Sequence, residues 1–242
     1  MNIPAMEAGQ RGNPLDTFSH DMNRIYPGKE DGYLSERIAY EHKKWLIKTA
    51  DIEISIHSGG SHSYLSETIF ATKDDKAQEL ARAMGEPWDL TLYSNRPSGS
   101  PMSVMSEIGK PAITVELGGR SATAPGAFHK VGEILKDAAL NIMKHYKMID
   151  GEPKYPVKRY KGFQKALLAP NSGIFLPEPS MKFHKMMNKG DLIARIIDYK
   201  GKELCKLNAP ENGMVFGLRA MPNVTTGDWC CFYAIIEGTW DK

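Results

Sequence analysis

The chain has 242 residues, of which 41% are hydrophobic and 25% are charged, and its 31 basic and 29 acidic residues give a net charge of +2. This is the composition of an ordinary globular protein with enough apolar side chains for a sizeable core. No block of Lys and Arg stands out, so nothing predicts binding to nucleic acid or to an anionic membrane. The sequence contains no run of about 18 apolar residues, so no transmembrane helix is predicted.

The three cysteines, Cys205, Cys230 and Cys231, form no CxxC pair. A set that is odd in number and sparse predicts reduced thiols rather than a disulfide framework. The N-terminus has no basic segment followed by an apolar stretch, so it is not a signal peptide. We therefore expect a cytoplasmic protein.

The first half of the chain shows the pattern of an α/β protein. Residues 1–32 are punctuated by Pro and Gly and predict a long loop, which in a compact domain is often functional. Four stretches predict helices: 34–50, 72–84, 101–108 and 125–148. In the first of them, Trp45 and Leu46 fall on the expected apolar face together with Leu34 and Ile38. Two short β-forming runs predict buried strands: 52–57 and 112–117. We expect helices on the faces of a sheet, with functional residues at the C-terminal ends of its strands.

From about Val157 the pattern changes to strand-sized pieces separated by Gly, Pro and Asp. One motif occurs twice, as Ala-Pro-Asn-Ser-Gly-Ile at 169–174 and Ala-Pro-Glu-Asn-Gly-Met at 209–214. Two copies of a strand–turn–strand unit predict a small all-β barrel or sandwich with pseudo-twofold symmetry. Gly, Pro and charges cluster at 151–156, so we predict an α/β domain at 1–155 and a C-terminal β-barrel domain at 156–242.

Two residues at predicted strand ends are candidates for chemistry. His57 precedes Ser-Gly-Gly, where the chain can turn tightly and the imidazole can project into a cleft and bind zinc. For a lone His without a nearby HxxE or HxxxH motif, a partly buried histidine with satisfied hydrogen bonds is the favoured alternative. Glu116 ends an apolar strand, where a carboxylate is costly to bury, so it either does chemistry or pairs with a nearby Arg.

Arginines in the predicted loops are candidates for binding a carboxylate. Asn23 and Arg24 are adjacent, and an Arg fork together with an Asn amide suits a carboxylate ligand. A solvent-exposed loop arginine is the alternative, and it is favoured for any single Arg. Arg11 and Arg96 have the same two interpretations.

Four blocks occur in a fixed order: Asp-Met-Asn-Arg-Ile-Tyr-Pro-Gly at 21–28, Ser-Glu-Arg-Ile-Ala at 35–39, Ile-His-Ser-Gly-Gly at 56–60, and Pro-Ala-Ile-Thr-Val-Glu-Leu-Gly-Gly at 111–119. Together they resemble the succinylglutamate desuccinylase/aspartoacylase family, which is related to zinc carboxypeptidases. The resemblance runs from Asn2 to about the C-terminus. The form with Gly-Gly after the His is similar to bacterial members, including N-acetyl-diaminobutyrate deacetylases.

The resemblance implies a zinc-dependent amidohydrolase that cleaves the amide bond of a small-molecule N-acyl amino acid. His57 matches the family's third zinc ligand, and Glu116 matches the general base that passes a proton from the zinc-bound water to the leaving amine. Arg11 matches the arginine that stabilises the oxyanion. Asn23 and Arg24 match the pair that binds the substrate carboxylate. The implied fold is a zinc-carboxypeptidase-like mixed sheet flanked by helices, N-terminally incomplete, with a small barrel-sandwich domain of the biotinyl/lipoyl type.

The sequence departs from the family at the metal site. The family's other two zinc ligands come from an HxxE motif upstream of the segment Asn-Ile-Pro-Ala, and none of the 7 histidines here has Glu three residues later. One protein ligand does not make a tight zinc site, so we expect this chain alone to lack a complete one. Without the first strands of the sheet a central strand becomes an edge, which predicts low stability, a homo-oligomer or an incomplete gene model. Ser55 stands where the family usually has Asp.

Two other functions stay open. The chain could be a non-catalytic binding protein that keeps the carboxylate grip of Asn23 and Arg24 without chemistry. It could also be a carrier that uses the C-terminal barrel, because Lys202 lies seven residues before Ala209, the spacing of the modified lysine in biotinyl and lipoyl domains. The residues around Lys202 match neither carrier motif, which disfavours modification.

Overall fold

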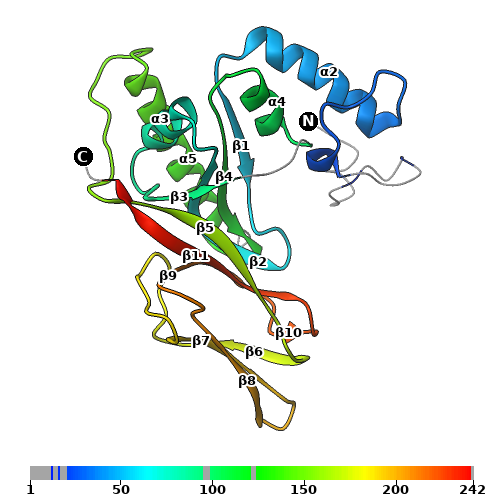
Figure 1. Cartoon of the computed structure of the whole chain (residues 1–242), viewed down its shortest axis with the longest axis vertical. Helices are drawn as coiled ribbons and strands as arrows, with labels where there is room; N and C mark the ends of the chain where they lie inside the picture. Colours follow the sequence, from blue (N-terminus) through cyan, green and yellow to red (C-terminus); the bar gives the residue numbers. More distant parts are fainter. Residues whose placement is uncertain (1–11, 13–15, 17–20, 95–98, 121–123, 241–242) are drawn as a thin grey trace. The chain divides into compact units, whose positions relative to one another are not determined.

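The computed structural model describes residues 12, 16, 21–94, 99–120 and 124–240 (Figure 1). The chain divides into two compact units. The first comprises residues 1–55, 72–80 and 95–114, and the second comprises residues 56–71, 81–94 and 115–242. Each unit is described by itself.

The helices of the described chain are η1 (Met22–Arg24), α2 (Leu34–Thr49), α3 (Asp75–Ala83), α4 (Pro101–Glu107) and α5 (Ala127–His145). All four predicted helices are confirmed, with ends that differ by a few residues. The helix expected from Thr72 begins at Asp75, because the side chain of Asp74 accepts a hydrogen bond from the backbone N–H of Ala77 at 3.0 Å and so caps the first turn.

The strands are β1 (Glu53–His57), β2 (Ser63–Ala71), β3 (Leu90–Tyr93), β4 (Ala112–Gly119), β5 (Arg159–Leu168), β6 (Gly173–Pro177), β7 (Leu192–Ile197), β8 (Glu203–Asn208), β9 (Gly213–Arg219), β10 (Asn223–Val224) and β11 (Trp229–Trp240). Seven of them form one sheet in the order β1-β4-β2-β3-β5-β11-β9, with a further pairing of β2 with β9. The other four form a sheet in the order β10-β6-β7-β8.

The larger sheet is mixed. Strands β2, β3 and β5 are parallel to one another, whereas β11 is antiparallel to both β5 and β9. The expected α/β fold with a mixed sheet is confirmed. Strands from both sides of the predicted boundary at 151–156 join this sheet, and the barrel-sandwich domain stays a prediction.

In the first unit, α2 and α4 share a small core in which Leu46 packs with Met102, Met105 and Ala112. The ammonium group of Lys110 donates to the carbonyls of Ile47 and Ala50 at 3.0 and 2.6 Å, and so satisfies acceptors at the C-terminal end of α2. Trp45, expected on the apolar face of this helix, is 60% exposed instead. The face of α2 that is buried contains small residues, which the helical pattern of large apolar residues does not reveal.

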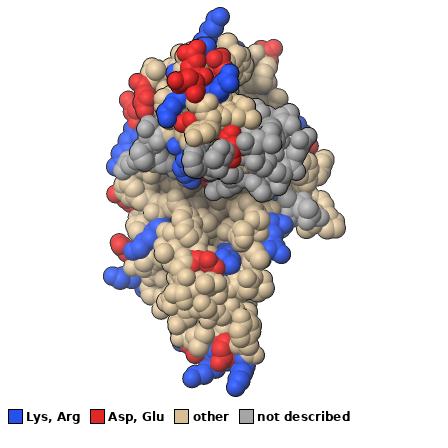
Figure 2. Space-filling view, turned by 90° about the vertical axis from the view of Figure 1, so that its right-hand side faces the viewer, with Lys and Arg blue, Asp and Glu red and all other residues tan. Residues whose placement is uncertain are grey.

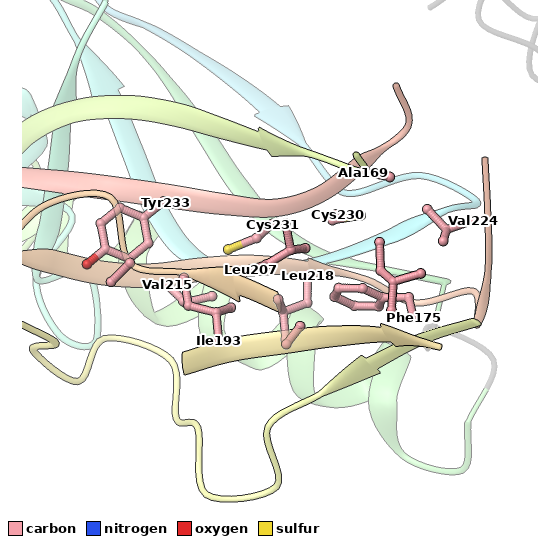
Figure 3. Close-up of a cluster of buried hydrophobic side chains, with 13 residues drawn as sticks. Ala169, Phe175, Ile193, Leu207, Val215, Leu218, Val224, Cys230, Cys231 and Tyr233 are labelled. Atoms are coloured by element: carbon pink, nitrogen blue, oxygen red, sulfur yellow. The ribbon is translucent and has the colours of Figure 1, made fainter. Parts of the chain in front are cut away.

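In the second unit, the four-stranded sheet packs against β9 and β11. Figure 3 shows Phe175 and Ile193 of the smaller sheet pointing toward Val215 and Cys231 of the larger one. Another cluster lies on β2, β3 and β9, where Leu90, Phe70 and Phe216 pack together. These two clusters fix β5, β9 and β11 next to β2 and β3.

The surface carries side chains of both charges, as the even charge balance of the chain predicts (Figure 2). On the face shown in Figure 2, acidic and basic side chains lie close to one another, and no field of one sign covers it. Of the helices that the structure describes, none is both long and apolar enough to cross a membrane.

Candidate active site

His57 and Glu116 lie near the ends of neighbouring strands. His57 is the last residue of β1, and Glu116 lies three residues before the end of β4, which pairs with β1. The N–H of Glu53 donates to the carbonyl of Pro111 at 3.0 Å, and the N–H of Gly59 donates to the carbonyl of Gly118 at 3.1 Å. These two contacts show that β1 and β4 run in the same direction. The predicted placement of both residues at the C-terminal end of the sheet is therefore confirmed.

The turns that follow these strands are packed backbone against backbone. A Cβ atom on Gly119 would lie 2.1 Å from the carbonyl oxygen of Ser63, and one on Gly59 would lie 2.3 Å from the same oxygen. Gly119 also has a φ of +141°, which L side chains rarely adopt. Glycine is required here so that the ends of β1 and β4 meet the start of β2.

Both side chains sit at the boundary between core and solvent. His57 and Glu116 are half-buried, whereas Val115 and Leu117, which flank Glu116, are fully buried. Because its neighbours along the strand are buried, the backbone of Glu116 is held in place and the range of positions open to its carboxyl group is limited. This is the arrangement expected for a general base.

A buried carboxyl group that the sequence analysis missed lies on the same strand as His57. The side chain of Glu53 is on the same face of β1 as Ser55 and His57, because strand residues alternate between faces. The Ser55 hydroxyl donates to Glu53 Oε1 at 2.5 Å. Burial raises the pKa of Glu53 to about 7, against a lowering by the hydrogen bond from Ser55. The apolar run Ile-Glu-Ile-Ser-Ile, with its acidic residue, was the available signal.

Asn23 and Arg24, the predicted carboxylate grip, lie together in the short helix η1 of the first unit. The carboxylate of Asp21 accepts a hydrogen bond from the N–H of Asn23 at 2.9 Å and so fixes the first turn. Arg24 is exposed, and its Nη1 donates to the carbonyl of Asn23 at 2.7 Å. This hydrogen bond holds one side of the guanidinium group in place, while Arg24 remains exposed to solvent.

The loop after η1 is fastened to the rest of its unit. Tyr26 is 6% exposed, packs with Ala39 and Val104, and its hydroxyl is 2.5 Å from His42 Nδ1. A Cβ atom on Gly28 would lie 2.3 Å from backbone atoms of α2, so only glycine fits there. The loop that presents Asn23 and Arg24 is held by packing on α2 and α4.

The described residues do not make up a metal centre. Within residues 12, 16, 21–94, 99–120 and 124–240, no group of three or more His, Cys, Asp or Glu side chains could hold a metal ion. His57, the predicted ligand, would supply one imidazole, whereas a zinc ion in a catalytic site has three ligands from the protein. The described residues by themselves therefore do not fit a complete zinc site. Arg11 and Arg96 lie outside the described residues.

Lys202 lies in the exposed turn between β7 and β8. The carboxylate of Asp198 accepts hydrogen bonds from the N–H groups of Lys200 and Lys202 at 2.8 and 2.9 Å. The turn is thus well formed and its lysine is accessible. Accessibility alone does not distinguish a carrier lysine from a surface lysine.

Comparison with known proteins shows the family to which the chain belongs. A family model described as the succinylglutamate desuccinylase/aspartoacylase catalytic domain matches residues 1–143, more than half of the chain. The N-alpha-acetyl-L-2,4-diaminobutyric acid deacetylase of Halomonas elongata is 26% identical over 245 residues, which cover 94% of this chain and 68% of that protein.

Solved structures share the fold. The crystal structure of a succinylglutamate desuccinylase from a Silicibacter species matches with a TM-score of 0.81 and 22% identity, over 98% of this chain and 73% of that one. The product-bound ectoine utilization protein EutE (DoeB) of Ruegeria pomeroyi matches with a TM-score of 0.79 and 23% identity, over 97% of this chain and 72% of that one. Fold and sequence agree, and the chain belongs to the succinylglutamate desuccinylase/aspartoacylase family.

Proposed function

We propose that this chain provides part of a deacylase that hydrolyses the amide bond of an N-acyl amino acid to a carboxylate and an amine. The observation that supports it is that Glu116 and His57 lie near the ends of two neighbouring strands, in a chain that matches the catalytic domain of a deacylase family. The N-acetyl-diaminobutyrate named for the Halomonas elongata relative makes N-acetyl amino acids the first substrates to test.

Each residue has a proposed role in this reaction. Glu116 accepts a proton from the attacking water and delivers it to the leaving nitrogen, which converts a poor leaving group into a neutral amine. Arg24 and Asn23 bind the substrate carboxylate through charge-assisted hydrogen bonds. Arg11 stabilises the oxyanion that forms at the scissile carbonyl.

Zinc is the proposed cofactor, with His57 as a ligand. Because the described residues supply one imidazole and no group of three ligands, no step of the reaction is assigned to the metal. The first test is the zinc content per chain after zinc loading and desalting, with His57→Ala as the comparison. Stoichiometric zinc that is lost in the variant supports the proposal. Absence of retained zinc contradicts zinc dependence for this chain by itself.

The second test is turnover of N-acetyl-L-2,4-diaminobutyrate, N-acetylaspartate and N-succinylglutamate, followed by release of the free amine. Glu116→Gln keeps the shape of the side chain and removes the base, so we expect a loss of about 10²- to 10⁴-fold in kcat. Glu107→Gln, on the exposed side of α4, is the matched control and should have no effect. Equal activity of the Glu116→Gln and unmodified proteins would exclude the proposed role of Glu116.

A non-catalytic binding function is the alternative, because Arg24 is exposed and a carboxylate could bind its guanidinium group without a metal ion. Titration of the metal-free protein with the same three compounds separates the two. Binding without turnover that weakens about ten- to a hundredfold in Arg24→Ala, as expected for loss of a charged hydrogen bond, favours the binding protein. Arg37→Ala, an exposed arginine of α2, is the control.

A further inference from the structure

A buried arginine in the second unit has two nitrogen atoms without a hydrogen-bond partner among the described residues. Arg159 is the first residue of β5 and is 5% exposed. Its Nε and Nη2 atoms are buried, and neither has a hydrogen-bond partner in the part of the chain that the structure describes. Buried charges are normally paired, so an unpaired guanidinium group calls for an explanation.

The neighbours of Arg159 are donors and cations. Trp240 is opposite Arg159 in the β5–β11 pairing, and its ring centroid is 5.3 Å from the guanidinium carbon. The indole Nε1 of Trp240 is also buried without a hydrogen-bond partner. Lys161 lies on the same face of β5, with its Nζ 4.9 Å from the same ring centroid. Opposite Lys161 on β3 is Thr91, whose buried hydroxyl has no partner either.

The electrostatics agree with the geometry. Burial, and after it the charge of Arg82, lower the pKa of Arg159 to about 10. Arg82 is exposed and lies at the end of α3, 4.3 Å over the ring of Tyr155. Asp89, the acidic residue just before β3, is engaged elsewhere, because its carboxylate is 2.6 Å from His184 Nδ1. Among the described residues, Arg159 Nε and Nη2, the Trp240 indole N–H and the Thr91 hydroxyl thus have no acceptor within hydrogen-bond distance.

We propose that Arg159, Trp240, Thr91 and Arg82 form a binding site for a small carboxylate, which we call the Arg159 site. Nε and Nη2 form one edge of the guanidinium group, and their parallel N–H bonds match the two oxygens of a carboxylate. The indole N–H and the threonine hydroxyl are further donors to the same ligand. Arg82 contributes a second positive charge from the solvent side. This site is independent of the proposed deacylase function.

Access to the Arg159 site is through movable side chains. Trp240 and Lys161 are half-exposed, and Arg82 is exposed. Lysine and arginine have long flexible stems, so a ligand reaches the guanidinium edge by displacing these side chains rather than by opening the core. We therefore expect millimolar rather than micromolar affinity for the simplest ligand, because part of the binding energy offsets this ordering.

The direct test is an acetate titration of the unmodified protein observed through its tryptophan indole N–H signals. The chain has 4 tryptophans, and Trp240→Phe assigns the signal of interest while keeping an aromatic ring under the guanidinium group. Sodium chloride at equal ionic strength corrects for screening, and sodium sulfate tests for a tetrahedral anion. We expect the Trp240 signal to shift saturably with acetate, while the exposed Trp45 does not respond.

Variants then test the assignment to Arg159. Arg159→Met removes the cation and keeps the stem, so the response of Trp240 to acetate should weaken about ten- to a hundredfold. Arg37→Met, an exposed arginine of the first unit, should leave it unchanged. If Arg159→Met does not fold, the titration of the unmodified protein still decides the question. A Trp240 response that is absent, equal in chloride, or found with sulfate alone would overturn the carboxylate site.

Discussion

Replacement of Glu53 by Gln should stabilise the protein above pH 7 and have little effect at pH 5. Glu53 is 8% exposed, and its Oε2 atom is buried with no hydrogen-bond partner among the residues that the structure describes. Burial raises the pKa of this carboxyl group from 4.5 to about 7, despite the hydrogen bond from Ser55. The ionised form is therefore less stable in the folded protein than in the unfolded chain.

The direction and size of the effect follow from proton linkage. The unfolded chain loses this proton near pH 4.5, whereas the folded protein keeps it until about pH 7. Between these values the folded state binds more protons, so the free energy of unfolding falls as the pH rises and levels off above pH 7. With about 1.4 kcal/mol for each unit of pKa, ionised Glu53 costs the folded state about 3 kcal/mol. Gln avoids this cost and keeps an acceptor for the Ser55 hydroxyl.

Urea unfolding from pH 5 to pH 8 measures the difference. Glu53→Gln should exceed the unmodified protein in free energy of unfolding by less than about 1 kcal/mol at pH 5 and by about 3 kcal/mol at pH 8. Glu107→Gln, at an exposed position of α4, is the control and should show no such trend. A difference that is the same at pH 5 and at pH 8 would show that Glu53 does not titrate abnormally.

Three further predictions concern the fold. Gly119→Ala should lower the free energy of unfolding by about 3 kcal/mol or more, because its Cβ atom would collide with the backbone of β2. Gly132→Ala, at an open position of α5, should instead raise it by about 1 kcal/mol, and urea unfolding of both variants measures the difference. Asp16→Ala should cost about 1 kcal/mol in the same assay, because the Asp16 carboxylate accepts a hydrogen bond from the first turn of α2 at 3.0 Å. A thiol reagent at pH 8 should label the half-buried Cys205 before the two buried cysteines of β11, whose pKa values are raised by burial; peptide mapping that finds all three labelled together would contradict this.

The sequence predicted those parts of the fold whose pattern is local. The apolar run of β4 is buried on both faces, and its composition alone indicates a central strand. The strand Ser63–Ala71 was missed, because it mixes polar and apolar residues without alternation and is nevertheless buried along most of its length. Its burial comes from pairing with β3 and β9, which are distant in the sequence. Such non-local contacts have no signature in a short window of residues.

The candidate site shows the same limit. A histidine and a glutamate at strand ends could be chosen from the sequence, because each interrupts an apolar run. The raised pKa of Glu53 and the buried nitrogens of Arg159 could not be predicted from the sequence, because burial of a charged residue depends on which elements cover it. Trp45 shows the reverse error: a large apolar side chain is exposed where the helical pattern predicts burial.

The four sequence blocks that identify the family contain packing residues as well as chemical ones. Tyr26 is buried beneath its loop, Gly28 touches the backbone of α2, and Gly119 touches the backbone of β2. These residues are needed for the fold whether or not the protein is catalytic, so the resemblance in these blocks does not by itself demonstrate turnover. His57 and Glu116 are half-buried at strand ends and are the residues of these blocks to which the chemistry is assigned. Zinc retention by His57 and the kinetic effect of Glu116→Gln are therefore the measurements that separate an active deacylase from a protein that keeps only its fold.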